Sequence, residues 1–281
     1  MSTVTPYEMA TFDDGDVTLS YEVYGSGDRL LVYIHGILLD THVNQRLARG
    51  LAEAGHRVVL LDLPGHGNSG KPLHASAHRM DAYAAHVVHL LDHLGAERAV
   101  VGGLSLGADV TLQVALLAPE RLQGMVLEMP VLEQATPVAA LIFVPWLAAT
   151  QYAAPVLRGL ASLIRHLPRE RLGLFDQVLG AALLEPEETA AVLHGVLVGP
   201  VAPTVEQRHA MEIPALVIGH RADRLHPFGD AHHLAEQLPQ GRLVEARSLL
   251  ELRMRPERLT AEIAGFLDEV WATPSRRRQP A

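Results

Sequence analysis

The stretch GLSLG at residues 103–107 follows an apolar run, AVV, at residues 99–101. Such a run predicts a buried strand, and the residues from Leu106 to Ala118, before Pro119, predict a helix. A serine between two glycines at this junction sits on a sharp turn, because glycines two positions away let the backbones approach closely. The start of the helix also directs backbone N–H groups at the serine. We therefore expect Ser105 to be a nucleophile.

Strands and helices are expected to alternate on both sides of this stretch. Apolar patterns predict strands at residues 17–24, 30–34, 58–61, 99–101, 123–127, 214–218 and 242–245. Helical spacing predicts helices at residues 44–54, 81–94, 230–238 and 256–270, besides the one after Ser105. The turn signal Asp14-Gly15 predicts an N-terminal hairpin. This alternation indicates an α/β fold, with a mostly parallel central sheet and helices on both faces.

The alternation stops between the strand at 123–127 and the strand at 214–218. The intervening sequence is rich in Ala, Leu and Pro and shows no strand pattern. We therefore expect a core domain at residues 1–130 and 211–272, with an inserted helical cap at residues 131–210. The basic end, residues 273–281, is expected to be a disordered tail.

Composition excludes several classes of protein. The chain of 281 residues has no cysteine, which rules out disulfides and thiolate chemistry. Its formal net charge of −9 argues against a nucleic-acid partner. The uncharged residues 136–157 contain three prolines, so we expect no membrane insertion. Residues 1–6 lack the features of a secretory signal, and we expect a cytoplasmic protein. The sequence leaves the oligomeric state open.

Three more segments join GLSLG in resembling the α/β-hydrolase superfamily, and the resemblance extends over residues 7–270. His35-Gly36 resembles the family's oxyanion loop, and DLPGHGNS at 62–69 resembles the glycine-rich turn after its fourth strand. GHRAD at 219–223, followed by His226-Pro227, resembles the loop that carries the acid. The resemblance implies an α/β-hydrolase fold.

The same resemblance implies roles for individual residues. Ser105 would be the nucleophile, and the backbone N–H groups of Ile37 and Leu106 would form the oxyanion hole. Asp223 would be the acid, although aspartate is also common as a turn residue in loops. Epoxide hydrolases and haloalkane dehalogenases carry aspartate at the nucleophile position, so Ser105 argues against those two classes.

The histidine of the family pattern is missing. It normally lies after the last strand, about seven residues before a Pro-Glu pair, and here Leu249 stands at that distance from Pro256-Glu257. No histidine follows His233. Without an adjacent base a serine hydroxyl is a weak nucleophile. Either a histidine from elsewhere acts as base, or another group does, or the protein is not a hydrolase.

His226 is the best substitute, because it lies three residues after Asp223 in a loop at the carboxyl edge of the sheet. Its alternative role is that of a loop-packing residue beside Pro227. His220 is a weaker candidate for the base.

Three further residues are candidates for the pocket. His35, like His66, either has a chemical role or fixes its loop. Glu128, at the end of a strand, is either a pocket acid or the partner of an arginine such as Arg253. Trp146, within the apolar stretch 141–146, lines a substrate pocket or belongs to the core of the cap.

His86, His89 and His93 share one helical stripe, which can bind a metal but is more typical of a solvated polar face. We expect no metal and no cofactor. The pattern predicts a serine-dependent, esterase-like hydrolase with a non-standard triad, acting on a hydrophobic small-molecule carboxylic ester or related acyl compound. One alternative is a non-hydrolytic ligand-binding protein or pathway enzyme of this fold, motivated by Leu249. Another is a structural or partner-binding module.

Overall fold

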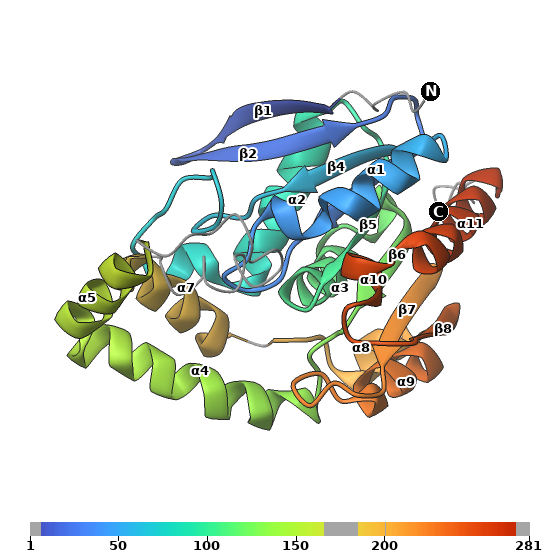
Figure 1. Ribbon diagram of the computed structural model, residues 1–281. Helices are drawn as coiled ribbons and strands as arrows, with labels where there is room; N and C mark the ends of the chain where they lie inside the picture. Colours follow the sequence, from blue (N-terminus) through green and yellow to red (C-terminus); the bar gives the residue numbers. More distant parts are fainter. Residues whose placement is uncertain (1–6, 166–184, 200, 274–281) are drawn as a thin grey trace.

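A single mixed sheet forms the centre of the molecule (Figure 1). The computed structural model describes residues 7–165, 185–199 and 201–273, and within these ranges the sheet has eight strands. They are β1 (Tyr7–Asp14), β2 (Val17–Tyr24), β3 (Leu30–Ile34), β4 (Arg57–Leu61), β5 (Ala99–Leu104), β6 (Leu122–Glu128), β7 (Ala215–His220) and β8 (Gly241–Ala246). Their order is β1-β2-β4-β3-β5-β6-β7-β8. The pairs β1–β2 and β2–β4 are antiparallel, and every pair from β4 to β8 is parallel.

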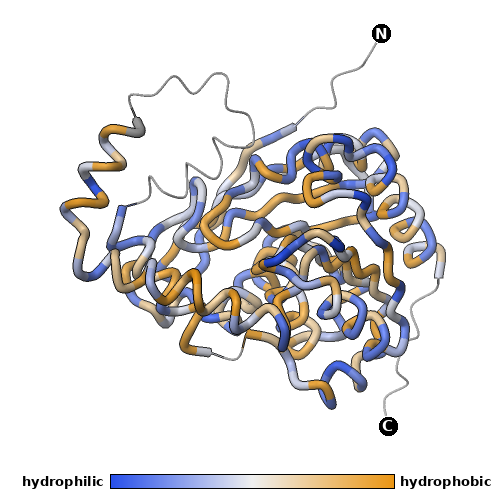
Figure 2. Tube along the Cα trace, turned by 60° about the horizontal axis from the view of Figure 1, so that its bottom comes forward, coloured by the Kyte–Doolittle hydropathy of each residue, from blue (hydrophilic) through white to orange (hydrophobic). Residues whose placement is uncertain are grey.

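Helices cover both faces of the sheet. On one face pack α2 (Met80–His93), α3 (Leu106–Leu117) and α9 (Phe228–Gln237), and on the other α1 (Gln45–Glu53), α10 (Glu251–Met254) and α11 (Glu257–Ala272). Successive strand residues alternate between the two cores: Val32 and Ile34 join the first, and Tyr33 joins the second. Figure 2 shows the hydrophobic residues gathered along these inner segments, with hydrophilic ones on outer turns.

Every strand and helix with predicted bounds is present, and their ends agree within two residues except in β5. The strand β5 runs three residues beyond the predicted end, through Gly102 and Gly103 to Leu104. Glycine usually weakens a strand, but it also allows close approach of a second backbone. A Cβ on Gly102 would lie 2.5 Å from the carbonyl oxygen of Val126, so the neighbouring strand requires glycine there. The predicted N-terminal hairpin is also present, with Asp14 opposite Val17.

Between β6 and β7 the regular elements that the structure describes are all helices. It contains α4 (Ala135–Tyr152), α5 (Ala154–Arg165), α7 (Pro186–Val198) and the short α8 (Val205–His209). The long helix α4 packs against α7, and α7 contacts the 3-10 turn Ala75–His78. Figure 1 shows α4, α5 and α7 together below the sheet. Residues 166–184 and 200 of the predicted cap, and all of the predicted tail except Thr273, fall outside the described residues.

Two buried side chains, Asp230 and Arg208, hold the start of α4. The buried carboxylate of Asp230, in α9, accepts hydrogen bonds from the backbone N–H groups of Leu132, Gln134 and Ala135 at 3.0, 3.0 and 2.9 Å. Arg208, whose side chain is fully buried, pairs with Glu133. The free N–H groups at the start of a helix need acceptors, and here a distant helix provides them. The start of α4 is therefore fixed to α9.

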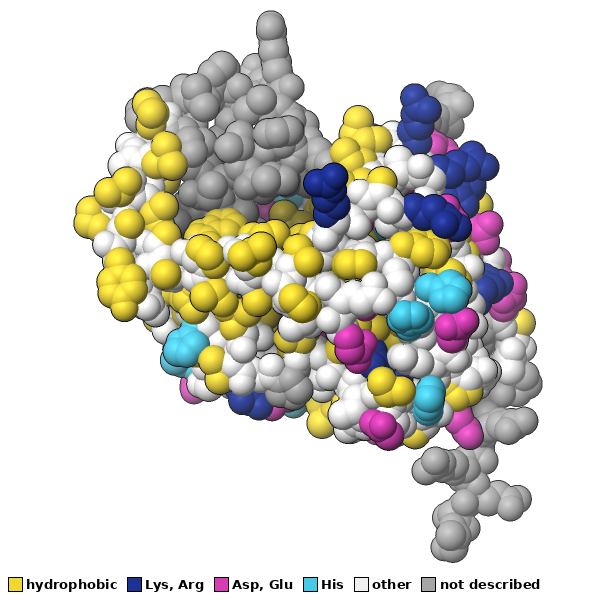
Figure 3. Space-filling view, turned by 90° about the horizontal axis from the view of Figure 1, so that it is seen from below, with side chains coloured by type: hydrophobic (Ala, Val, Ile, Leu, Met, Phe, Trp, Pro, Cys, Tyr) yellow, Lys and Arg dark blue, Asp and Glu magenta, His cyan; other side chains and the backbone are white. Residues whose placement is uncertain are grey.

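The outer face of α4 and α5 is strongly apolar. Large exposed side chains include Leu141, Val144, Tyr152, Val156 and Leu160, and Figure 3 shows hydrophobic side chains gathered on this part of the surface. Among the described helices, α4 is the one that is long and apolar enough to cross a membrane by length and composition, and only 11% of it is buried. Composition of this kind is weak support for a membrane span, and Pro145 lies inside the helix.

Candidate active site

Ser105 lies on a strained turn between β5 and α3. Its φ of 52° and ψ of −109° are rare for a residue with a side chain. A Cβ on Gly103 would lie 2.6 Å from the backbone of Gly107, and a Cβ on Gly107 would lie 2.5 Å from the carbonyl oxygen of Ile34. The two glycines therefore let the strand, the turn and the helix come together. The Ser105 N–H donates to the carbonyl of Glu128 at 2.8 Å, which fixes the turn to β6.

The structure brings Ser105, Asp223 and His226 together. Nε2 of His226 lies 2.9 Å from Oγ of Ser105, and Nδ1 lies 2.7 Å from Oδ2 of Asp223. The ionised carboxylate only accepts, so Nδ1 carries the proton and Nε2 is free to accept the serine hydroxyl proton. A hydrogen-bonded chain of this kind can activate a serine hydroxyl for nucleophilic attack.

Asp223 also builds the loop that presents His226. Its Oδ1 accepts the backbone N–H groups of Leu225 and His226 at 2.8 and 3.0 Å. Burial alone would raise the pKa of Asp223, but the hydrogen bonds and charge of His226 outweigh burial and lower the pKa. The carboxylate is therefore ionised at neutral pH, and it holds both the backbone and the ring of the residue three positions later.

Two backbone N–H groups are available beside Ser105. Among the described residues, no protein acceptor is found for the N–H of Ile37 or of Leu106. Leu106 follows Ser105 directly, and the Ile37 loop packs against the same turn, since a Cβ on Gly36 would contact Leu104 at 3.5 Å. The loop turns sharply at Leu38, whose φ is 57°. Both N–H groups therefore belong to backbone that packs at the Ser105 turn.

His35 and His66 are buried and bonded to backbone. His35 donates from Nδ1 to the carbonyl of Gly36 at 2.8 Å and accepts the Leu63 N–H at Nε2, at 3.1 Å. Nδ1 of His66 lies 3.0 Å from the carbonyl of Pro64. Burial lowers the pKa of both imidazoles, which favours their neutral forms. His35 thus joins the Ile37 loop to the glycine-rich turn, and the structure gives it loop contacts in place of a contact with Ser105.

Glu128 belongs to a buried charged cluster on the far side of the turn. Its Oε2 is 2.7 Å from Arg253 and accepts the hydroxyl of Tyr33 at 3.0 Å. His220 approaches Oε1 at 3.7 Å and bonds through Nδ1 to the carbonyl of Ser248 at 3.0 Å. Burial would raise the pKa of Glu128, but Arg253 and His220 lower it to about 2. Of the two roles considered for Glu128, the structure shows the partnership with Arg253.

Leu249 and Trp146 are the remaining positions singled out from the sequence. Leu249, where the family pattern has histidine, is 42% exposed in the loop after β8. Trp146 is half-buried and stacks with Phe143 at 6.4 Å between ring centroids, on the side of α4 that packs against the core. The other four residues of the stretch 141–146 are exposed, so only Phe143 and Trp146 pack against the core.

Sequence patterns missed several residues that organise the site. In the sequence, Tyr33 resembles an ordinary strand residue and Asp230 an acidic residue at the start of a helix. Their partners, Glu128 and the amides at residues 132–135, are far away in the chain. The helical stripe of histidines also changes in the structure. His86 and His89 contact Asp14, whereas His93 bonds to the hydroxyl of Tyr21 at 3.2 Å. The hairpin turn at Asp14 was the available signal, but no local pattern connects it with the helix.

Comparisons with known proteins agree with this architecture. The chain is 39% identical over 105 residues to the dihydrolipoyllysine-residue acetyltransferase component of the acetoin cleaving system of Pseudomonas putida, and 38% identical over 97 residues to epoxide hydrolase B of Mycobacterium tuberculosis. These matches cover 37% and 34% of this chain but only 28% and 27% of the relatives.

A solved structure extends the likeness to nearly the whole chain. The enol-lactonase from Burkholderia xenovorans LB400 superposes with a TM-score of 0.75 at 19% identity, covering 92% of this chain and 100% of that one. Similarity at this level of identity shows a shared fold. A sequence model of the alpha/beta hydrolase fold family matches residues 29–212, which is more than half of the chain. This protein therefore belongs to the α/β hydrolase fold family.

Proposed function

We propose that the protein is a serine-dependent hydrolase of hydrophobic small-molecule carboxylic esters or related acyl compounds. The observation that carries this proposal is the continuous chain of contacts from Ser105 through His226 to Asp223, at 2.9 and 2.7 Å. Hydrolases are among the relatives and structural neighbours of the chain, which supports the coarser assignment. The fold by itself does not specify a reaction, so the site has to supply the argument.

In the proposed reaction Ser105 Oγ attacks the acyl carbonyl carbon while its proton passes to Nε2 of His226. The negative charge that develops on the carbonyl oxygen is stabilised by the N–H groups of Ile37 and Leu106. The carbon–oxygen bond to the alcohol then breaks, and His226 returns the proton to the leaving oxygen. Water attacks the acyl-serine with His226 as base, which releases the acid and restores Ser105. The reaction requires neither metal nor cofactor.

The apolar character of the cap supports a hydrophobic substrate. α4 carries no charged residue, and its half-buried side chains Phe143, Trp146 and Leu147 pack against the core. Apolar side chains with few polar groups are the usual lining of small-molecule sites.

The non-hydrolytic alternative rested on the absence of a histidine after the last strand. Leu249 does leave that loop without a base, but the contacts of His226 with both Ser105 and Asp223 support His226 in that role.

A fluorophosphonate probe tests the proposal, because it reacts with an activated serine hydroxyl and expels fluoride. Intact mass spectrometry of the wild type should show addition of one probe. Ser105→Ala should show no addition. His226→Ala should react more slowly than the wild type by a factor on the order of 10³ or larger. His232→Ala, on the exposed face of α9, is the matched control and should label like the wild type.

Equal labelling rates for wild type and His226→Ala would contradict the relocated base. An activated serine would be contradicted if the wild-type protein reacted with neither the fluorophosphonate nor the smaller phenylmethylsulfonyl fluoride. A series of p-nitrophenyl esters of increasing acyl length then defines the substrate class. We expect kcat/KM to increase from the p-nitrophenyl acetate to esters with longer acyl chains.

A further inference from the structure

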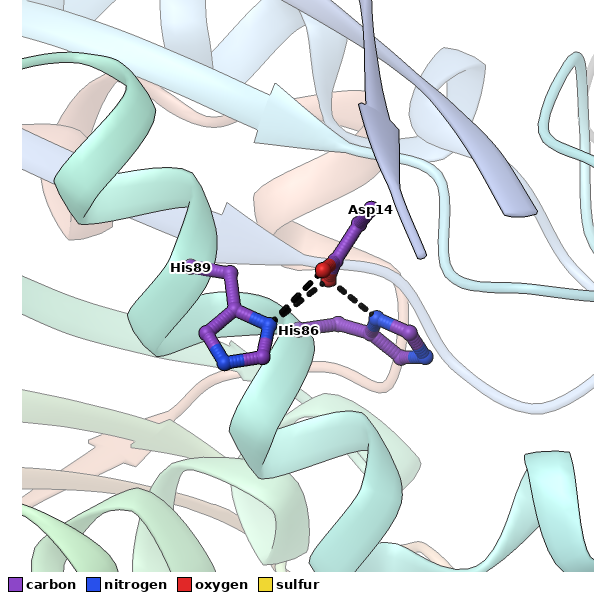
Figure 4. A group of neighbouring side chains, drawn as sticks. All are labelled: Asp14, His86 and His89. Carbon is purple, nitrogen blue, oxygen red and sulfur yellow. Dashed lines mark hydrogen bonds and ion pairs between the residues drawn. The ribbon is translucent and has the colours of Figure 1, made fainter. Parts of the chain in front are cut away.

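Three side chains with metal-binding atoms converge at the edge of the sheet, away from Ser105. Asp14 is the last residue of β1, and His86 and His89 lie one turn apart on α2. Figure 4 shows both imidazole rings directed at the Asp14 carboxylate. Nδ1 of His86 lies 2.6 Å from Oδ2, and Nδ1 of His89 lies 2.8 and 2.9 Å from Oδ1 and Oδ2. One carboxylate therefore faces two nitrogen atoms of the same chemical type.

The spacings between the carboxylate oxygens and the imidazole nitrogens are close to those of a metal site. The ligand atoms of the three residues all lie within 4.8 Å of one another. Around a tetrahedral zinc ion with bonds of about 2.0–2.2 Å, neighbouring ligand atoms are about 3.3 Å apart. The observed nitrogen–oxygen distances are shorter by about half an ångström, because hydrogen bonds now join the atoms. A small rotation of the side chains would admit an ion in place of the two bridging protons.

Exposure leaves the side chains room for this movement and gives an ion access. The side chain of His89 is 52% exposed, while those of His86 and Asp14 are 17% and 13% exposed. His93, the next member of the helical stripe, is engaged elsewhere, stacked on Phe12 at 4.9 Å and bonded to Tyr21. The described residues thus supply three ligands and leave the fourth position to water.

We propose that Asp14, His86 and His89 bind a divalent transition-metal ion of the zinc class. Two imidazoles and one carboxylate favour zinc and its neighbours in the first transition row over calcium and magnesium, which prefer oxygen ligands. Four strand spacings separate β1 from β5, which is about 19 Å across the sheet. The ion would therefore act as a brace between the exposed edge hairpin and α2, and it would take no part in the chemistry at Ser105.

Isothermal titration of zinc chloride into the full chain, prepared without a polyhistidine tag and stripped with a chelator, tests the site. The wild type should bind one ion per chain, and the melting temperature should rise when zinc is added. His89→Ala should bind about tenfold more weakly or worse, and His86→Ala/His89→Ala should lose both binding and the thermal shift. Cobalt should give a visible absorption band in the wild type that the double variant lacks.

His232→Ala/His233→Ala, which removes another pair of exposed histidines on one helix, is the matched control and should bind like the wild type. Circular dichroism without metal checks that each variant is folded, and Asp14→Asn provides a further variant with unchanged histidines. Equal zinc affinity in the wild type and His86→Ala/His89→Ala would overturn the proposal. The proposal would also be overturned if the wild type bound no zinc. It would likewise be overturned if His232→Ala/His233→Ala lost the binding of one zinc ion per chain.

Discussion

Nε2 of His226 lies 2.9 Å from Oγ of Ser105, although 121 positions separate the two residues in the chain. His226 is also only three positions after Asp223, whose carboxylate bonds to its backbone and to its ring. The acid and the proposed base therefore share one short loop after β7. The usual position for the histidine of this family, after the last strand, holds an exposed leucine instead.

Replacing Asp223 with Asn should remove most of the proposed activity while preserving the size of the side chain. An amide can donate a hydrogen to Nδ1 of His226, which would place the imidazole proton on Nε2, where it cannot accept the serine hydroxyl. We expect kcat for ester hydrolysis to fall on the order of 10⁴-fold, measured with a p-nitrophenyl ester. Asp268→Asn, on the exposed face of α11, should retain wild-type kcat. Asp223→Asn with unchanged kcat would show that the carboxylate does not orient the base.

Replacing Ser105 with Gly should stabilise the fold relative to Ser105→Ala. Both variants lack the hydroxyl, but the φ of 52° remains strained for alanine and is relaxed for glycine. We expect Ser105→Gly to be more stable by about 1 kcal/mol in urea denaturation, after the greater entropy of glycine in the unfolded chain is included. Neither variant should react with the fluorophosphonate. If Ser105→Gly proved less stable than Ser105→Ala, the turn would not store strain.

Acid should remove a contribution to stability that comes from Glu128. Its folded-state pKa of about 2 lies below the ordinary value of 4.5, because Arg253 and His220 outweigh the effect of burial. The stabilisation is complete above about pH 4.5 and is lost as the pH falls through about 2, amounting to about 3 kcal/mol. Free energies of unfolding measured from pH 6 to pH 2 should fall more steeply for the wild type than for Glu128→Gln.

Glu128→Gln should also lower the free energy of unfolding at neutral pH by about 3 kcal/mol or more, because Arg253 would remain buried without an anionic partner. Combining Glu128→Gln with Arg253→Met should recover part of this loss, which a double-mutant cycle measures. Glu187→Gln, at an exposed pair with Arg158, should change stability far less than Glu128→Gln at any of these pH values. Additive effects of Glu128→Gln and Arg253→Met would rule out a coupled pair.

Replacing Asp230 with Ala should loosen the start of the cap. Three backbone N–H groups at residues 132, 134 and 135 would lose their acceptor, and we expect a loss of about 2 kcal/mol. Hydrogen exchange of these amides should accelerate, while exchange in β5 and β6 should stay slow. Asp81→Ala, at the exposed start of α2, serves as the control. Unchanged exchange at residues 132–135 would mean that the helix is held by other contacts.

Local patterns were sufficient for the fold. Apolar runs located the central strands β3 to β7, because these strands are buried on both faces. Apolar periodicity located helices such as α1 and α2, because one side of each packs against the sheet. GLSLG also gave the position of Ser105, since the turn needs glycine at both ends for steric reasons that are independent of the rest of the chain. The close pairing of Asp223 and His226 likewise lies within four residues of sequence.

Long-range contacts were beyond the reach of such patterns. Nothing near Glu128 indicates that Arg253, 125 positions later, neutralises it, although the pair was considered as one of two alternatives. Nothing near Asp230 indicates three amides almost a hundred positions earlier. The histidine stripe on α2 was visible, but the stripe does not reveal that Asp14 joins two of its members while Phe12 and Tyr21 engage the third. Side-chain partners depend on tertiary packing, which periodicity does not encode.

The hydrogen bonds between Asp230 and the start of α4 connect α4 to the segment that carries the proposed base, His226. Asp230 is in the first turn of α9, and His226 immediately precedes Pro227, the residue that caps this helix. A displacement of the first turn of α4 would pull on the same short segment that holds the imidazole against Ser105. Movement of α4 for entry or release of a ligand would therefore shift His226 relative to Ser105. If α4 instead bends at Pro145, which interrupts the helix, its first turn and His226 would stay in place.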